Sequence, residues 1–186
     1  MNNTLDVIKK RRSVRNFKSE QIADSEIASI IEAGMYAPSG RGDQSWYFTV
    51  VQNTELLYEV SEAVKRIYAS LDNPFLQSQG KNEKYHLFYH APTVIIVSGN
   101  KDALLPELDC AVCVQNILIA AESLDIGSCW ISGIDLLAAT EEGRPIIKKL
   151  NIPDAYKPYV SVALGFKKNE NPKAAPRKEN NIHFIR

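Results

Sequence analysis

Apolar residues recur every three to four positions in several stretches of the chain, which is the period of one face of an α-helix. In the second stretch Ile27, Ile30 and Ile31 form such a stripe, and Asp24 is its candidate N-terminal cap. The predicted helices run from Thr4 to about Arg12, from Asp24 to about Gly34, from a cap at Asn53 or Thr54 to the break at Asn73-Pro74, from Pro106 to about Asp125 with Gly127 closing it, and around Pro145 to Leu150.

Shorter runs rich in β-branched and aromatic residues predict strands between these helices. The predicted strands are Trp46 to Val51, Thr93 to Ser98, Ser128 to Ile131 and Tyr159 to Phe166. The polar stretch from Phe75 to His90 fits neither pattern, and we interpret it as a lid or an irregular helix. No strand is followed by a glycine-rich phosphate loop. If the chain binds a nucleotide cofactor, side chains must therefore hold its phosphate.

The helix predicted from Pro106 to about Asp125 is apolar on nearly all of its sides. A helix of this kind is buried on every side, and in a small chain a subunit interface is a natural way to bury it. The tail from Lys167 to Arg186 shows no pattern of a packed domain until Ile182 to Ile185. We therefore expect a dimer in which the tail is an arm that docks elsewhere.

Composition narrows the class of protein. The 22 Lys and Arg residues balance the 22 Asp and Glu residues, so nothing global favours nucleic acid or an anionic membrane as a partner. Residues 1–12 are too polar for a secretory signal, and the longest apolar run, Ile117 to Ala121, is too short to span a bilayer. The three cysteines do not form a secreted disulfide framework. We expect a cytoplasmic protein that binds neither nucleic acid nor membrane.

A basic segment near the start is the first candidate for chemistry. Arg11, Arg12 and Arg15, together with the hydroxyl of Ser13, place three guanidinium groups within five residues. Arginine forks match the oxygens of a phosphate, and a hydroxyl adds another donor. The alternative is a solvated basic helix end, which the negative end of the helix dipole favours. Spacing alone favours this alternative.

Two further segments have the character of ligand-binding loops. Ala37 to Trp46 is a polar loop with small residues that would let a planar ligand approach the backbone closely. Gly127 to Gly133 predicts a strand that ends where backbone amides can point at a ligand. The simpler interpretations are a plain connection from helix to strand and a strand end with a turn glycine.

Other reactive side chains have simpler explanations. Cys110 and Cys113 are three positions apart on a helix, where free cysteines pack as small apolar residues. His86 and His90 have the spacing of zinc ligands, but no third ligand is evident, so we expect no metal site. The apolar neighbours of Trp130 favour a place in the core over a role as a platform for substrate.

Taken together, these segments resemble the FMN-dependent nitroreductase family over essentially the whole chain. The resemblance rests on four motifs in the same order and spacing as in that family. They are Arg11 to Arg15, Ala37-Pro38-Ser39 before Gln44 and Trp46, the Gln115-Asn116 pair in the long helix, and Gly127 to Gly133. The implied fold is α+β, with three layers in which a central, mostly antiparallel sheet lies between helices. Residues 1–166 would form the FMN-binding domain, and residues 167–186 would be an arm of it exchanged in a homodimer.

The resemblance also implies a role for each matching residue. Arg11, Arg12, Ser13 and Arg15 would hold the phosphate and ribityl chain of FMN, with Arg15 also near the polar edge of the flavin. From the partner subunit, Pro38, Ser39 and Gly40 would reach the flavin. Ile131, Ser132 and Gly133 would lie at the flavin ring, Asn82 at its pyrimidine edge, and Arg177 with Lys178 would return from the tail to the phosphate.

The implied activity is ping-pong transfer of hydride from NADH or NADPH through FMN to a small-molecule electron acceptor, such as a nitroaromatic or a quinone. Because the flavin carries the redox chemistry, no catalytic side chain is required. The chain departs from the family at Gly42, where the family usually has Asn, and at Ser45, where it usually has Pro. Two alternatives remain at this point: a flavin-binding or storage protein with little turnover, and a flavin-free interaction domain.

Overall fold

The computed structural model describes residues 3–186, so Met1 and Asn2, the start of the polar N-terminal stretch, lie outside the described residues. Its centre is a sheet of four strands in the order β1-β2-β4-β3, with every neighbouring pair antiparallel. The strands are β1 (Trp46–Val51), β2 (Thr93–Asn100), β3 (Ile126–Ile131) and β4 (Tyr156–Phe166). Both central strands are buried almost throughout, which explains why their sequences read as continuous apolar runs.

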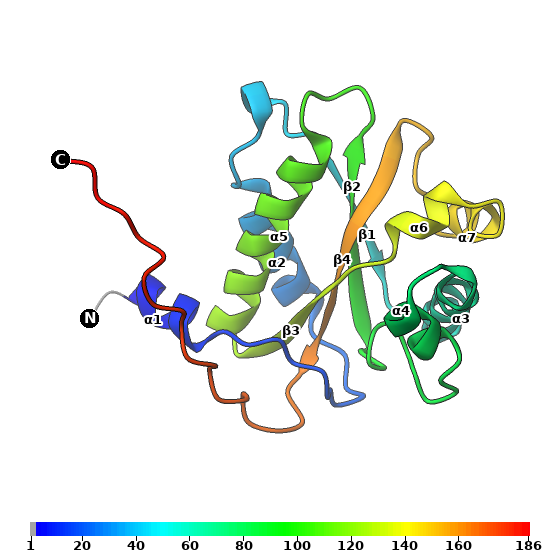
Figure 1. Cartoon of the computed structure of the whole chain (residues 1–186), viewed down its shortest axis with the longest axis horizontal. Coiled ribbons are helices and arrows are strands. Elements are labelled where there is room, and N and C mark those ends of the chain that lie inside the picture. Colours follow the sequence, from blue (N-terminus) through cyan, green and yellow to red (C-terminus); the bar gives the residue numbers. More distant parts are fainter. Residues whose placement is uncertain (1–2) are drawn as a thin grey trace.

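Helices cover both faces of this sheet (Figure 1). On one face lie α2 (Asp24–Met35) and α5 (Pro106–Ser123), and on the other lie α3 (Thr54–Ser70), α4 (Pro74–Gly80), α6 (Asp135–Ala139) and α7 (Arg144–Lys149). Two buried apolar clusters result, one on each side of the sheet. The predicted α+β fold with an antiparallel sheet between helices is confirmed.

Helices α2 and α5 approach each other closely at Gly34. A Cβ atom at this glycine would lie only 2.9 Å from Cγ1 of Ile117 and 3.1 Å from the sulfur of Cys113. Cys110 and Cys113 are fully buried in this layer, as the sequence predicted. Burial raises the pKa of each thiol to about 12, so both stay protonated and act as small apolar side chains.

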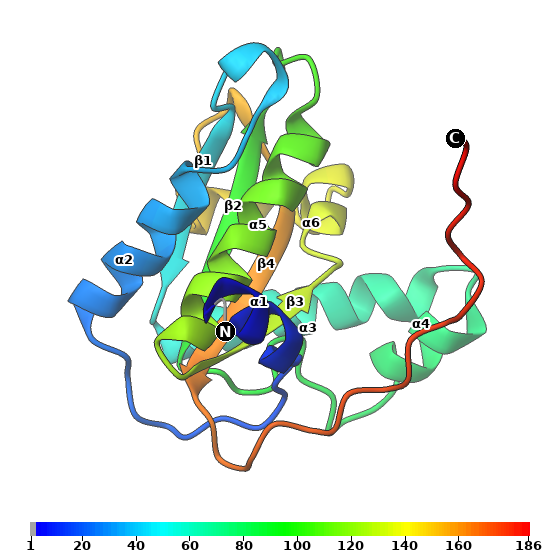
Figure 2. The same cartoon turned by 90° about the vertical axis from the view of Figure 1, so that its left-hand side faces the viewer.

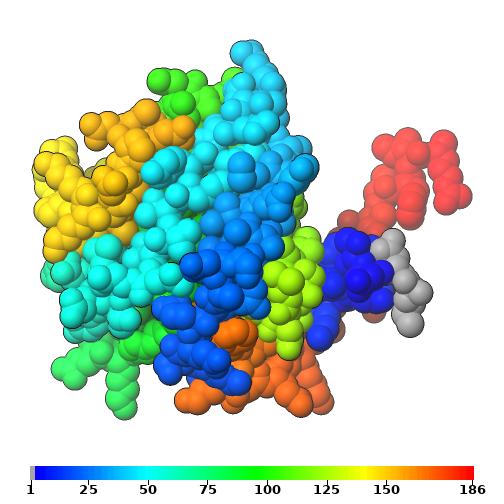
Figure 3. Space-filling model, turned by 180° about the vertical axis from the view of Figure 1, so that it is seen from behind, coloured from blue at the N-terminus to red at the C-terminus, as the bar shows by residue number. Residues whose placement is uncertain are grey.

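Both ends of the chain lie outside this three-layer body. Helix α1 (Asn3–Lys10) has no buried residue, and its Leu5 and Ile8 are exposed beside α5. Residues 167–186 form no helix or strand, and Figures 2 and 3 show their last part standing away from the rest of the molecule. Within residues 3–186, no helix combines the length and apolar character that a bilayer-spanning segment needs.

Three details of the predicted elements were wrong. Ala23, rather than Asp24, is the N-cap of α2, and the Glu26 carboxylate accepts a hydrogen bond from its backbone N–H. Gly127 does not close α5, because Asp125 adopts the left-handed conformation (φ 59°) that turns the chain, and Gly127 then lies within β3. The short helix α6 was missed, because five residues are too few to show a helical period.

Candidate functional site

The segment from Arg11 to Arg15 runs in extended form along the outer edge of β3. Ser13 forms a parallel bridge with Ser128, and the Val14 N–H donates to the Ser128 carbonyl oxygen over 2.9 Å. Val14 is buried, which fixes the segment to the sheet. The arginines on either side of Val14 therefore lie next to the strand that leads to Ile131.

The positive charges of this basic segment have no negatively charged partners among the described residues. In residues 3–186, no carboxylate forms an ion pair with Arg11, Arg12 or Arg15. One guanidinium nitrogen of Arg12 donates to the Arg11 carbonyl oxygen, while its Nε is buried without a hydrogen-bond partner. A buried donor without an acceptor is costly in a finished structure. The segment therefore has the properties of an anion site, which makes the solvated helix end the weaker interpretation.

Ser132 and Gly133 directly follow the last residue of β3 and are held by contacts with Tyr68 and Trp130. Gly133 has a φ of +99°, and a Cβ atom there would lie 2.2 Å from the hydroxyl oxygen of Tyr68. That hydroxyl donates to the Ser132 carbonyl oxygen over 3.4 Å, and the Trp130 indole donates to the Ser132 hydroxyl over 3.2 Å. Only glycine fits at position 133, for both its conformation and its contact.

Two adjoining cavities connect these elements. A cavity of about 250 Å³ has a largely aromatic lining, and we call it the aromatic cavity; it is lined by Tyr68, Phe75, Leu76, Gln79, Tyr85, Leu87, Tyr89, Trp130, Ile131 and Ser132. A cavity of about 430 Å³ has a basic lining, and we call it the cationic cavity; it is lined by Arg15, Asn16, Phe17, Asn82, Lys84, Tyr85, His86, Tyr89, His90 and Lys168. Tyr85 and Tyr89 belong to both linings, and the Arg15 guanidinium lies 5.7 Å from the centre of the Tyr89 ring.

The structure therefore brings together Arg15, Asn82, Ile131 and Ser132 around two shared tyrosines. The stretch from Phe75 to His90 supplies much of both linings, through α4 and the turns that follow it. Burial raises the pKa of Tyr85, so its hydroxyl stays neutral and can donate a hydrogen bond.

The prediction that Trp130 belongs to the core was wrong. Its side chain is 39% exposed and lines the aromatic cavity. Side chains alternate between the two faces of a strand, so the buried neighbours Cys129 and Ile131 direct Trp130 to the opposite face. The exposure of Trp130 shows that the described residues cover this face of β3 only in part.

His86 and His90 lie with their ring centres 4.2 Å apart, yet the geometry does not suggest a metal site. The Nδ1 atom of His86 accepts backbone hydrogen bonds from Phe88 and His90. Burial, and then the neighbouring His90, lowers the pKa of His86 to about 4, so its ring is neutral near pH 7. Within residues 3–186, no group of three potential metal ligands comes together.

Pro38, Ser39 and Gly40, which were predicted to act across a subunit boundary, lie far from the basic segment of the same chain. Gly40 contacts Asp109 in the first turn of α5, whereas Lys10, directly before the Arg11–Arg15 segment, lies 4.0 Å from the carboxylate of Glu122 in the last turn of α5. A helix of 18 residues is about 27 Å long. One chain therefore does not bring these two groups together.

The structure shows how the loop that contains Pro38, Ser39 and Gly40 is held. The buried Asp109 carboxylate accepts from the Gly40 N–H over 2.9 Å and from the Ser45 hydroxyl over 2.8 Å. Asp109 could not be singled out from the sequence, because a carboxylate in the first turn of a helix is ordinarily an exposed partner of the helix dipole. Ser45 stands where the family usually has proline. Its hydroxyl donates a hydrogen bond to the buried Asp109 carboxylate, which a proline could not do.

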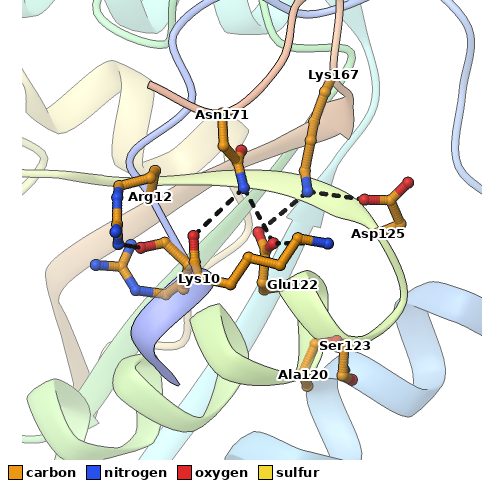
Figure 4. A network of polar contacts seen from close by, with 9 residues as sticks. Lys10, Arg12, Ala120, Glu122, Ser123, Asp125, Lys167 and Asn171 are labelled. Carbon is orange, nitrogen blue, oxygen red and sulfur yellow. Dashed lines mark hydrogen bonds and ion pairs between the residues drawn. The ribbon is translucent and has the colours of Figure 1, made fainter. Parts of the chain in front are cut away.

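The root of the C-terminal tail is held by a second buried carboxylate that the sequence analysis missed (Figure 4). Glu122, at the end of α5, accepts from the Lys167 ammonium over 3.1 Å and from the Asn171 amide over 3.0 Å. Asn171 also donates to the Lys10 carbonyl oxygen over 3.4 Å, which places the tail beside the start of the basic segment. Farther along, Arg177 and Lys178 are exposed, and the Arg177 guanidinium contacts its own Ala175 carbonyl oxygen instead of the basic segment.

Comparison with known proteins decides the family of this chain. Residues 8–166 match the model of the nitroreductase family. The chain belongs to the nitroreductase family. A nitroreductase from Bacteroides fragilis NCTC 9343 with bound FMN is 38% identical and superposes with a TM-score of 0.93, and each chain is covered completely. A nitroreductase from Desulfitobacterium hafniense DCB-2, also with bound FMN, is 31% identical with a TM-score of 0.89 and complete coverage of both chains.

A relative with an assigned reaction supports the same family. The FMN reductase (NADPH) of Bacillus subtilis strain 168 is 27% identical over 199 residues, which cover 97% of this chain and 74% of that protein. The chain is thus an enzyme of a family of oxidoreductases, and the resemblance found in its four sequence motifs is confirmed.

Proposed function

We propose that this nitroreductase-family protein binds FMN and uses it to move hydride from NADH or NADPH to a small oxidised acceptor, such as a nitroaromatic or a quinone. The observation that carries the proposal is the arginine segment without ion-pair partners, which is held at the edge of β3, the strand that precedes Gly133. A phosphate there would supply the acceptor that the buried Arg12 Nε lacks.

The residues of this chain fit such a cofactor. We assign the phosphate and ribityl chain to Arg11, Arg12 and Ser13, and the polar edge of the ring to Arg15 and Asn82. The backbone from Ile131 to Gly133 would lie at the ring. Gly133 lets Tyr68 pack directly against this backbone, because the Tyr68 hydroxyl fills the space that a side chain at position 133 would need. In bound form, FMN supplies a ring that can accept a hydride at one time and give it up at another.

The protein's own task is then to position one planar molecule at a time. The walls of the aromatic cavity offer ring faces for stacking, and the Ser132 hydroxyl and the Gln79 amide offer polar contacts. Donor and acceptor would occupy this place in turn, which gives ping-pong kinetics. Holding the reacting atoms in contact distance and orientation supplies most of the rate.

A homodimer would complete the site. The face formed by α1 and α5 leaves large apolar side chains exposed, including Leu5, Ile8, Leu108 and Val112, and the tail exposes Ile182, Phe184 and Ile185. Exposed apolar surface of this extent indicates a protein partner. In the dimer we expect Pro38, Ser39 and Gly40 to reach the partner's flavin, and residues 167–186 to be an exchanged arm that brings Arg177 and Lys178 to a phosphate. Residues 1–166 would then be the flavin-binding body of a cytoplasmic enzyme.

The test is direct. Purified protein should be yellow, should release FMN rather than FAD, and should oxidise NADH or NADPH when menadione is supplied. Double-reciprocal plots at several menadione concentrations should be parallel, as for a ping-pong enzyme. Yellow protein without turnover would favour a flavin-storage role, and colourless protein that ignores added FMN would refute the proposal.

A further inference from the structure

Glu122 is a buried carboxylate in the last turn of α5, and side chains from both ends of the chain converge on it (Figure 4). Its oxygens accept from the Lys167 ammonium over 3.1 Å and from the Asn171 amide over 3.0 Å. The Lys10 ammonium lies 4.0 Å from the same carboxylate, whose side chain is only 2% exposed. A buried carboxylate is costly unless charges and hydrogen bonds satisfy it, so these partners are held firmly.

These contacts act on the start of the basic segment. The Asn171 amide also donates to the Lys10 carbonyl oxygen over 3.4 Å, so it bridges the Glu122 carboxylate and the backbone directly before Arg11. No residue of α1 is buried, so the packing of this helix anchors the segment only weakly. The position of the backbone that enters the basic segment therefore depends on Glu122.

The far end of the segment is held by the sheet and does not need Glu122. The Val14 N–H donates to the Ser128 carbonyl oxygen over 2.9 Å. Just beyond the segment, the Lys168 N–H donates to the Asn16 carbonyl oxygen over 3.1 Å. The first two arginines lie between these backbone bonds and the Glu122 contacts. Their placement is thus fixed by the sheet on one side and by the buried carboxylate on the other.

We propose that Glu122 is a positioning residue that holds Arg11 and Arg12 in place for the phosphate of FMN. It acts through Asn171 and the Lys10 backbone rather than by contact with the flavin. This inference rests on the proposed function and adds to it a residue that supports the phosphate site from behind. Electrostatics alone predicts the opposite effect, because a carboxylate near a phosphate repels it and its removal would tighten binding. The sign of the change in affinity therefore separates positioning from charge.

The experiment titrates flavin-free protein with FMN and with riboflavin for Glu122→Ala, Glu122→Gln and Asn171→Ala. Riboflavin has the same ring without the phosphate, so the ratio of the two affinities isolates the phosphate contacts. Asp125→Asn is the matched control. Asp125 contacts the same Lys167 ammonium over 2.9 Å, but its side chain is 84% exposed. Asparagine also tolerates the left-handed backbone (φ 59°) at this position.

Glu122→Ala should weaken FMN binding by about tenfold or more and riboflavin binding by less than about twofold. Asn171→Ala should lower the ratio of affinities in the same way. The double variant should be no worse than Glu122→Ala, because both substitutions break one path. Glu122→Gln keeps an oxygen for the Asn171 amide and should recover much of the ratio, whereas Asp125→Asn should leave it unchanged.

Unchanged or tighter FMN binding by Glu122→Ala would overturn the inference. Equal losses for FMN and riboflavin would do so as well, because they mark a merely structural role, and so would additive losses in the double variant. If circular dichroism shows that Glu122→Ala is unfolded, Asn171→Ala carries the test, and an unchanged ratio in that variant overturns the inference. Failure of the wild-type protein to bind FMN would overturn the proposed function itself, which separates the two failures.

Discussion

Removal of the Asp109 carboxylate should destabilise the protein strongly and release the loop that contains Pro38, Ser39 and Gly40. Asp109 is only 3% exposed and accepts hydrogen bonds from the Gly40 N–H and the Ser45 hydroxyl. Asp109→Ala leaves both donors without an acceptor, and the Ser45 donor is buried. Each orphaned group costs about 1–3 kcal/mol, so the two together should lower the free energy of unfolding by about 2–6 kcal/mol.

Two milder variants separate the contributions. Ser45→Ala removes one hydrogen bond to a charged acceptor and should cost about 1.5–3 kcal/mol. Asp109→Asn keeps an oxygen for the Gly40 N–H and an amide that can donate to the Ser45 oxygen, so it should recover much of the loss. For a chain of this size, 1 kcal/mol corresponds to about 2–4 °C in Tm, so Asp109→Ala should melt roughly 10 °C below the wild type.

The assay is urea unfolding followed by circular dichroism, together with hydrogen exchange of the Gly40 amide. Glu107→Ala is the matched control, because Glu107 lies in the same first turn of α5 but is exposed. Its loss should cost only the helix-dipole contribution, about 0.3–1 kcal/mol. If Asp109→Ala unfolds at the same urea concentration as Glu107→Ala, the carboxylate does not hold the loop and our reasoning is wrong.

Three further predictions follow from other parts of the structure. Arg15→Glu should weaken FMN binding by about tenfold or more while the fold is retained. Lys18→Glu makes the same charge change at an exposed position and should leave the affinity for FMN unchanged. Equal affinities of the two variants, measured by flavin fluorescence, would refute the role of Arg15. Deletion of residues 167–186 should abolish both dimerisation, measured by sedimentation, and FMN binding, measured by absorbance. Deletion of residues 173–186 alone keeps the contacts of Glu122 with Lys167 and Asn171, and it should have the same two effects. A stable monomer that still holds FMN would refute a binding site shared between two subunits. Because His86 stays neutral in the folded protein down to about pH 4 but gains a proton near 6.5 when unfolded, stability should fall as the pH drops from about 6.5 to about 4, and the urea midpoint of His86→Asn should depend less on pH in this range.

The sequence predicted the parts of the fold that have strong periodic patterns. Strand β1 has the predicted bounds, and α2, α3 and α5 begin within one residue of their predicted starts. The end of α5 and the start of β3 were less accurate, because a non-glycine residue, Asp125, makes the left-handed turn between them. Tertiary context overrides local preference at such positions.

The candidate site was predicted only in part, and the reason is physical. Motifs identified the basic segment, which the structure places along the edge of β3, and Ser132-Gly133, which directly follows the last residue of β3. The two buried carboxylates, Asp109 and Glu122, were missed because their partners are far away in the sequence. A charged residue is ordinarily expected at the surface, so the sequence alone gives no reason to place either carboxylate in the interior. Their contacts become visible only in the folded structure.

The central claim is that an FMN phosphate binds at the uncompensated basic segment, and titration of flavin-free protein with FMN and with riboflavin tests it most directly. The two ligands share the same ring and differ only in the phosphate. At least two charge-assisted hydrogen bonds to the phosphate should make FMN bind about 100-fold more tightly than riboflavin, with one FMN for each chain. Equal affinity for both ligands, or binding of neither, would contradict the account.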